Sequence, residues 1–208
     1  MKMRKSAEER KNEIMASALR LADELGPDSL SVEAIARDVG LTQPGVFRHF
    51  PTKQAIWEAV TDTITDRMID GWNTVYSRGG QPVEQLRELI LTQFRFIHTT
   101  PAIPAILFSR ELHAKNNRLR ETVFNLLAQF HQAIASQVTK AQDAGTFRRD
   151  FNVNDVSFLL IGLVQGLAVR WSLSGRSFVL IDEGARLLDI QIQLFTTPYS
   201  HILEDGKS

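Results

Sequence analysis

The sequence predicts an all-α protein of about nine helices. Proline is poorly tolerated inside helices, and all seven prolines of the chain lie at or near predicted helix breaks. Between these breaks apolar residues recur at helical spacing, whereas alternation with a period of two is almost absent. The nearest strand candidate, residues 177–181, is too short and isolated to change the prediction.

The predicted helices divide the chain into two units. Three shorter helices fall within residues 1–52, where Gly26 and Gly40 are expected to end helices and Ser31 and Thr42 to cap them. After Lys53 the helices are longer and apolar on more sides, so residues 53–208 form the second unit. The expected helices cover about residues 7–25, 32–38, 42–50, 53–77, 83–98, a stretch ending near 115, 118–144, 155–173 and 182–196.

The composition excludes several kinds of site. The 208 residues contain no cysteine, which rules out disulfides, thiolate zinc sites and cysteine nucleophiles. With 43% apolar and 23% charged residues, the chain is typical of a soluble globular protein. Its 24 basic and 24 acidic residues give a formal net charge of zero. This balance argues weakly against a nucleic-acid partner, because proteins that bind nucleic acid usually present a basic face.

The N-terminal segment carries a local excess of positive charge. Its five basic side chains stand against Glu8 and Glu9, a difference of 5 − 2 = +3. Such an arm could contact DNA phosphates, and it could equally be a solvated terminus. The basic residues are Lys2, Arg4, Lys5, Arg10 and Lys11.

The stretch SVEAIARDVGLTQPGVFRHF, residues 31–50, has the pattern of a helix-turn-helix. Ala36 is small where the second helix must pack against the third, and Gly40 can adopt the backbone conformation of the turn. An ordinary helical hairpin is the alternative on this pattern alone. The expected small core consists of Ile35, Val39, Leu41, Val46, Phe47 and Phe50.

The longer segment GLTQPGVFRHFPTKQAIWEAV resembles the TetR family of bacterial transcription regulators. That family typically has a recognition helix opened by Ser or Thr, an aromatic pair near its end, and a Ser/Thr-Lys step into a long helix. Residues 145–150, GTFRRD, and residues 159–175, LLIGLVQGLAVRWSLSG, also look like the turn and the eighth helix of the family. The residues that carry the first resemblance are Thr42, Phe47, Phe50, Thr52 and Lys53.

Three positions depart from the family pattern, and they concern operator contacts more than the fold. Gln43 and Pro44 replace the commoner basic residue and glycine. Phe47 stands where tyrosine is commoner. Its ring is expected to face the small core, and contact with a phosphate or a thymine methyl group is the alternative.

A short helix with small and polar groups at its N-terminal end can enter the major groove of DNA. Gln43 could pair with adenine, whereas Arg48 could pair with guanine or, equally, hold a phosphate. The helix openings at Ser31 and Lys53 favour phosphate, and His49 is expected at the groove edge or in solvent. The predicted DNA-binding residues are Ser31, Thr42, Gln43, Pro44, Gly45, Phe47, Arg48, His49 and Lys53.

The segment 156–171 is apolar nearly all round, which implies a second partner besides the core of its own subunit. Gly162 and Gly166 would let another helix pack closely. One helix-turn-helix makes few phosphate contacts, so two copies on a symmetric homodimer are expected. An interior helix of a single subunit is the alternative. The predicted interface consists of Leu159, Gly162, Leu163, Gly166, Leu187, Ile190 and Leu194.

The resemblance also implies a small-molecule site among the helices that follow residue 53. A largely apolar pocket with one or two polar anchors, and therefore a hydrophobic effector, is expected. The alternative for each aromatic residue is a plain core position. The candidate ligand-binding residues are Trp72, Tyr76, Phe94, His98, Phe108, Phe124, His131 and Gln165.

The sequence therefore predicts a DNA-binding transcriptional regulator. It is expected to be a repressor that binds a palindromic double-stranded operator as a dimer and is released when its effector shifts the conformational population. The alternative is a ligand-independent DNA-binding protein of the same fold that acts in chromosome organisation or cell division. A closed interior would favour this alternative, and a cavity that opens to solvent would favour the effector-controlled regulator.

An enzyme, a cofactor, a metal site and a membrane partner are not expected. The sequence has no P-loop, Gly-x-Ser-x-Gly or HExxH motif. Glu111 and His113 are two residues apart, so they would not share one face of a helix. Residues 156–173 include Gln165 and Arg170, which favours a buried soluble helix over a membrane span. The first eleven residues lack an apolar region, so a cytoplasmic protein is expected.

Overall fold

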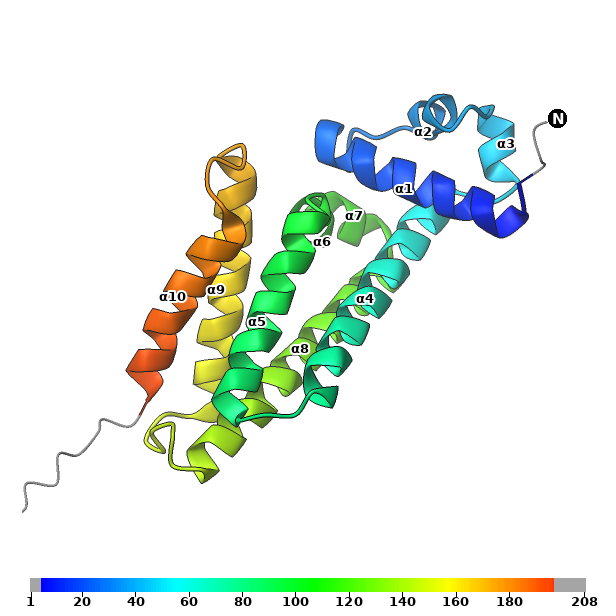
Figure 1. Cartoon of the computed structure of the whole chain (residues 1–208). Coiled ribbons are helices and arrows are strands. Elements are labelled where there is room, and N and C mark those ends of the chain that lie inside the picture. The colour runs from blue at the N-terminus through cyan, green and yellow to red at the C-terminus, as the bar shows by residue number, and fades with distance from the viewer. Residues whose placement is uncertain (1–4, 197–208) are drawn as a thin grey trace, which may run out of the picture.

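The computed structural model describes residues 5–196, and that range contains ten helices and no strand (Figure 1). The all-α prediction is therefore confirmed. Three N-terminal helices form a small head, and the remaining helices form an elongated body. The helices are α1 Ala7–Leu25, α2 Val32–Asp38, α3 Gln43–Phe47, α4 Lys53–Ser77, α5 Pro82–Thr99, α6 Ile103–Leu107, α7 Arg110–Lys115, α8 Asn117–Asp143, α9 Val153–Leu173 and α10 Leu180–Phe195.

The tenth helix arises because one predicted helix, the stretch ending near residue 115, is divided in two. Phe108 ends α6, and Ser109 has an extended backbone with φ −69° and ψ 109°. The Ser109 hydroxyl accepts a hydrogen bond from the backbone N–H of Leu112 at 3.1 Å and so caps α7. Serine competes for backbone hydrogen bonds in this way, and that is why it favours helix ends over helix interiors.

The turn between α2 and α3 has the hydrogen bonds of a Schellman motif. Gly40 has φ +67°, and the Leu41 N–H donates to the Ala36 carbonyl oxygen at 2.8 Å. The predicted N-caps are present, since the Ser31 and Thr42 side chains accept hydrogen bonds from the backbone N–H groups of Ala34 and Gly45. The short helices α2 and α3 can therefore form with few packed residues because their ends are well satisfied.

A carboxylate fastens α2 to α1 across the head. Asp38 accepts a hydrogen bond from the Ser17 hydroxyl at 2.5 Å and forms an ion pair with Arg20. These two donors, Ser17 first, hold the pKa of Asp38 below its ordinary value. Beneath them Ile14, Ala18 and Ile35 are buried, so the polar clasp closes the edge of a small apolar core.

Helix α4 runs from the head into the body without interruption (Figure 1). The Thr52 side chain caps it by accepting from the Ala55 N–H at 3.0 Å. It packs against α1 in the head and against α5 and α8 in the body. At the body end, Trp72 stacks on Phe130 with 5.0 Å between ring centroids and donates to Gln93 Oε1 at 3.2 Å.

In the body, α5 packs against α4, α8, α9 and α10, which makes it the central helix. The contact between α5 and α10 requires glycine, because a Cβ at Gly184 would lie 2.6 Å from the ring of Phe94. A bidentate ion pair joins the same two helices, with Arg87 Nε 2.7 Å and Nη2 3.0 Å from the carboxylate oxygens of Asp189.

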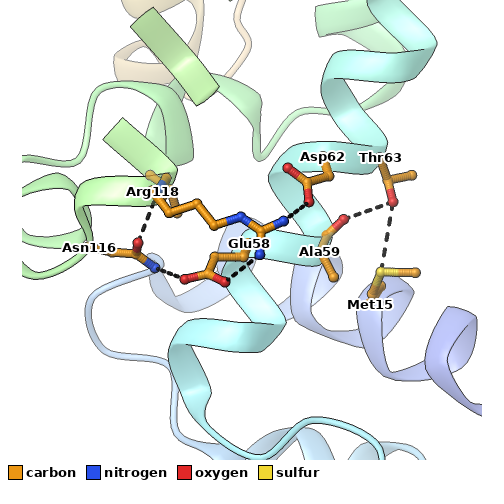
Figure 2. A network of polar contacts seen from close by, with 8 residues as sticks. Met15, Glu58, Ala59, Asp62, Thr63, Asn116 and Arg118 are labelled. Carbon is orange, nitrogen blue, oxygen red and sulfur yellow. Dashed lines mark hydrogen bonds and ion pairs between the residues drawn. The ribbon is translucent and has the colours of Figure 1, made fainter. Parts of the chain in front are cut away.

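Polar contacts also join the start of α8 to α4 (Figure 2). Asn116 Nδ2 lies 2.9 Å from Glu58 Oε1, and Arg118 reaches both Glu58 at 3.2 Å and Asp62 at 2.9 Å. The Ser109 hydroxyl donates to Asp28 Oδ1 in the α1–α2 loop at 2.8 Å. The segment from α6 to α8 is thus attached to the head and to α4 at once.

A second attachment joins the turn between α9 and α10 to the head. Arg176 forms an ion pair with Asp23 of α1, and its guanidinium lies 5.4 Å from the ring centroid of Trp171. Arg176 has φ +63°, the one positive φ among the described residues other than glycine. The left-handed backbone is costly for a side chain with a Cβ, so the turn holds this arginine in place by specific contacts.

By length and composition alone, α9 could span a membrane. In the fold, however, it packs against α5, α6, α8 and α10. Val156, Leu160, Val164 and Trp171 are buried in these contacts. Its apolar character is thus explained on one side by the core, and the opposite side is described below.

The Asp38 clasp leads to a prediction about stability. Asp38→Asn removes the ion pair with Arg20 and should lower the free energy of unfolding by about 1 kcal/mol at neutral pH. Because the folded pKa is lowered, the stabilisation is complete above the ordinary aspartate pKa of about 4 and is lost as the pH falls through the folded pKa. Urea unfolding of both proteins across this pH range measures the difference.

Glu33→Gln on the same helix is the matched control. It removes an exposed ion pair with Arg37 and should leave the free energy of unfolding nearly unchanged. A gap between wild type and Asp38→Asn that stays constant as the pH falls would contradict the role given to the Asp38 charge.

Candidate nucleic-acid interface and body cavity

Helix α3 presents a polar surface outward and an apolar surface inward. Thr42, Gln43 and Arg48 are exposed, as is Pro44. On the inner side Val46 is 0% exposed and anchors the helix in the head. A short helix that is buried on one side and open at its N-terminal end has the form that a major groove accepts.

Two predictions about α3 are wrong in detail. Phe47 was expected to face the core, but its side chain is 38% exposed, because Val46 and Phe50 already fill the interior at this end of the helix. Gly45 was expected to border the groove, but it is buried. A Cβ at Gly45 would lie 3.3 Å from Thr42 Oγ1, so its small size serves the cap rather than a base contact.

The other predicted DNA contacts occupy different positions. Ser31 is exposed at the start of α2, and His49 is half-buried after α3. Lys53 is half-buried at the start of α4 and also lines a cavity between head and body. Arg48 is exposed and has no ion pair among the described residues, so its charge is available to an external anion.

The positive charge of the N-terminal arm is partly used within the head. Lys5 and Arg10 both pair with Glu13, the latter at 2.9 Å. Arg10 and Lys11 are half-buried. Lys2 and Arg4 lie outside the described residues. The sequence could not indicate this pairing, because Glu13 lies beyond the charged segment that defined the arm.

The outer face of α9 carries an uncovered apolar stripe. Leu159 is 54% exposed, and Gly162, Gly166, Val169 and Leu173 continue the stripe at alternating spacings of three and four residues. A Cβ added at Gly162 or Gly166 would meet nothing within 4 Å. A repeat of this kind is the seam that a second helix packs against.

Helix α10 packs beside α9 (Figure 1) and also carries exposed apolar side chains. Ile190 is exposed, Leu194 is 65% exposed, and Leu187 is half-buried, as is Leu163 of α9. All seven residues predicted for a dimer interface are thus exposed or half-buried in the protomer, on two adjacent helices. Phe158, which sequence reasoning did not select, extends the outer face of α9 and packs against His131 at 4.7 Å.

A small apolar cavity lies between α5, α6, α8 and α9 in the body, and we call it the body cavity. Its volume is about 40 Å³, little more than the roughly 30 Å³ that one water molecule takes up. Phe108 and Gln165 line it, as predicted for ligand-binding residues. Trp72 lies one layer behind, against Phe130. Further lining residues are Gln93, Ile97, Ile103, Phe130, Ile161 and Val164.

The other ligand candidates do not line the body cavity. Phe94 packs under Gly184, and Tyr76 donates its hydroxyl to the Ala133 carbonyl oxygen at 3.1 Å. The remaining three lie elsewhere: His98 is exposed beside Trp171, Phe124 is exposed on α8, and His131 packs against Phe158.

Gln93 was missed by sequence reasoning, although one signal was present. It is a buried amide in the apolar α5, where a polar side chain needs partners. It accepts from Trp72 and donates to Met68 Sδ at 3.6 Å, so it connects the cavity wall to α4.

An exposed recognition helix in a three-helix head, carried on a helical body, defines the class of helix-turn-helix DNA-binding regulators. Residues 14–60 match the bacterial regulatory proteins of the tetR family, and residues 82–179 match the tetracyclin repressor-like C-terminal domain. This chain belongs to the TetR family of DNA-binding transcriptional regulators.

Individual relatives of known name are distant. The nucleoid occlusion factor SlmA of Vibrio cholerae is 24% identical over 190 residues, which cover 88% of this chain and 96% of SlmA. The ketosteroid transcriptional regulator KstR2 of Mycobacterium tuberculosis superposes with a TM-score of 0.78 at 20% identity, covering 90% of this chain and 95% of KstR2. A regulator from Saccharomonospora viridis in complex with choline has a TM-score of 0.80 at 20% identity, covering 91% and 99%.

Proposed function

We propose that the protein is a dimeric repressor that binds a palindromic operator and is released by a small apolar effector. The observation that carries the proposal is the combination of an exposed α3 with an uncovered apolar stripe on α9 and exposed apolar side chains on α10 in one protomer. Two copies joined through the stripe would form a four-helix bundle and present two recognition helices, and a palindrome requires both. Because such a protein acts on chromosomal DNA, we expect it in the bacterial cytoplasm.

The effector would enter the body cavity by displacing Phe108. This ring is partly exposed and lines the cavity, whose present volume of about 40 Å³ is far below the roughly 300 Å³ or more that ligand pockets usually have. The neighbouring residue, Ser109, donates a hydrogen bond to Asp28 of the head. A ligand that moves Phe108 would therefore pull on the head, and this offers a direct route from binding to a changed separation of the recognition helices.

The proposal predicts that Arg48 contributes to operator binding. Once footprinting of DNA flanking the gene has located the operator, Arg48→Ala should weaken specific binding by about 1–3 kcal/mol if the side chain reads a base. If Arg48 holds a phosphate, binding should weaken equally for all sequences. The slope of log affinity against log salt concentration should then decrease by the amount that corresponds to about one phosphate contact per subunit. Affinity measured over a range of salt concentrations distinguishes these cases.

Arg120→Ala is the matched control, because Arg120 is another exposed arginine, on α8 of the body. It should leave DNA affinity unchanged. Full affinity of Arg48→Ala for both specific and unrelated DNA would remove α3 from the interface.

The dimer is tested by adding a side chain in the middle of the stripe. Gly166→Leu meets open space within the protomer, so the fold should be preserved. Between two subunits the same leucine would hold the helices apart, and the dimer should weaken by roughly tenfold or more. Sedimentation or light scattering against concentration measures this change.

Gln129→Leu, on the exposed surface of α8, is the control and should leave the dimer intact. An unchanged dimer in Gly166→Leu would place the interface elsewhere.

A second candidate is a ligand-independent role in chromosome organisation or cell division. The small volume of the body cavity favours it, as does the similarity to the nucleoid occlusion factor SlmA over most of the chain. Chromatin immunoprecipitation separates the two functions. The repressor should occupy one or a few promoter sites, and loss of the gene should raise transcription beside them. The second role requires sites spread over the chromosome and altered septum placement without such a change.

A further inference from the structure

A second cavity lies at the junction of head and body, outside the proposed effector site. Its volume is about 190 Å³, and we call it the junction cavity. Helix α4 contributes Lys53 and Trp57, which lie four residues apart on one face. Asp28 comes from the α1–α2 loop, and Leu112 and Leu119 come from α7 and α8. The cavity is therefore bounded by the head, by the linking helix and by the segment next to the body cavity.

The wall of the junction cavity contains polar groups whose hydrogen bonds are incomplete. Trp57 is 3% exposed, and its indole N–H has no acceptor within the described residues. The indole nitrogen is inaccessible to water, so the Trp57 ring lines the cavity and its N–H does not contact a molecule bound there. Lys53 likewise makes no ion pair or hydrogen bond in the described part of the chain.

The charges around the junction cavity are balanced. Lys115 donates to Glu111 and lowers the pKa of that carboxyl, and the charge of Lys53 lowers it slightly further. This leaves Lys53 as the cation and Asp28 as the anion that are not joined in an ion pair, since Asp28 accepts only from the Ser109 hydroxyl among the described residues. A ligand with one negative and one positive group would pair with the half-buried Lys53 and the exposed Asp28 at once.

The remaining wall is apolar. Leu112 and Leu119 are buried, and the Trp57 ring adds a flat hydrophobic surface. A volume of about 190 Å³ would hold about six water molecules at roughly 30 Å³ each. If the cavity held only water, these apolar side chains would stay in contact with water. A small apolar side chain would remove that surface from water.

We propose that the junction cavity binds a free amino acid with an apolar side chain. Its carboxylate lies against the Lys53 ammonium, its ammonium group lies against Asp28, and its side chain packs on Leu112, Leu119 and the Trp57 ring. The bound molecule joins the α1–α2 loop to α7 and α8, and so fixes the head relative to the body. This site is independent of the effector proposed for the body cavity.

The test follows the indole N–H signals of the full-length protein labelled with ¹⁵N-tryptophan, in the absence of DNA. The Trp57 signal is assigned by its loss in Trp57→Phe. Three probes share one ring: L-phenylalanine carries both charges, 3-phenylpropanoate carries only the negative one, and phenethylamine carries only the positive one. Phenylalanine should shift the Trp57 signal at millimolar concentration, phenylpropanoate should do so more weakly, and phenethylamine should have no effect.

Two variants test the charge assignments. Lys53→Met should weaken the binding of phenylalanine and of phenylpropanoate by about tenfold or more. Asp28→Asn should weaken phenylalanine alone, because only this probe carries the ammonium group. Gln129→Leu, on the exposed surface of α8, should leave all three titrations unchanged.

The proposal is overturned if no probe moves the Trp57 signal, if phenethylamine binds as well as phenylalanine, or if Lys53→Met binds like wild type. These titrations are made without DNA and follow only the Trp57 signal, so they measure neither operator binding nor dimerisation. Failure here is therefore distinguishable from failure of the proposed function.

Discussion

The position of the head depends on one constraint, which is that a single rigid helix belongs to both parts of the molecule. Helix α4 has 25 residues, which corresponds to roughly 37 Å at 1.5 Å per residue. Its far end is held by Trp72, which stacks on Phe130 and donates to Gln93. Because Gln93 also lines the body cavity, a change there reaches α4 through a hydrogen bond, and α4 carries it to the DNA-facing end. In the proposed repressor, an effector that disturbed this contact would reorient the recognition helix.

Much of the fold could be predicted because its helix ends are set by capping residues that lie next to them in the sequence. The expected bounds of α1, α2 and α4 agree with the structure, and Ser31, Thr42 and Thr52 cap helices as expected. The division between α6 and α7 was not predictable in the same way. Ser109 could have lain inside a helix, and its hydrogen bond to Asp28, 81 residues earlier, became visible only in three dimensions.

The candidate sites differ in how well sequence reasoning located them. The stripe on α9 was identified because its two glycines and leucines repeat along one segment, a purely local signal. The ligand candidates fared worse, because an aromatic residue at helical spacing looks the same whether it lines a cavity or fills the core. Phe94 illustrates this: its surroundings are set by Gly184, which lies on another helix and admits the ring only because it lacks a Cβ. The spacing of apolar residues along the sequence does not indicate such tertiary contacts.

The unusual backbone of Arg176 has a mechanical consequence. Its ion pair with Asp23 ties the tip of the α9–α10 hairpin to α1, while α4 supports the head from the other side. The contacts therefore form a closed ring that runs through the head, α4, the body and the α9–α10 hairpin. The head can tilt only if one of these contacts breaks. The weakest of these contacts is the ion pair between Arg176 and Asp23. A partly exposed ion pair contributes little stability, and its turn has a costly backbone conformation. Release of this turn would therefore free the head to tilt, and the movement would reach α9, α10 and the DNA-binding head together.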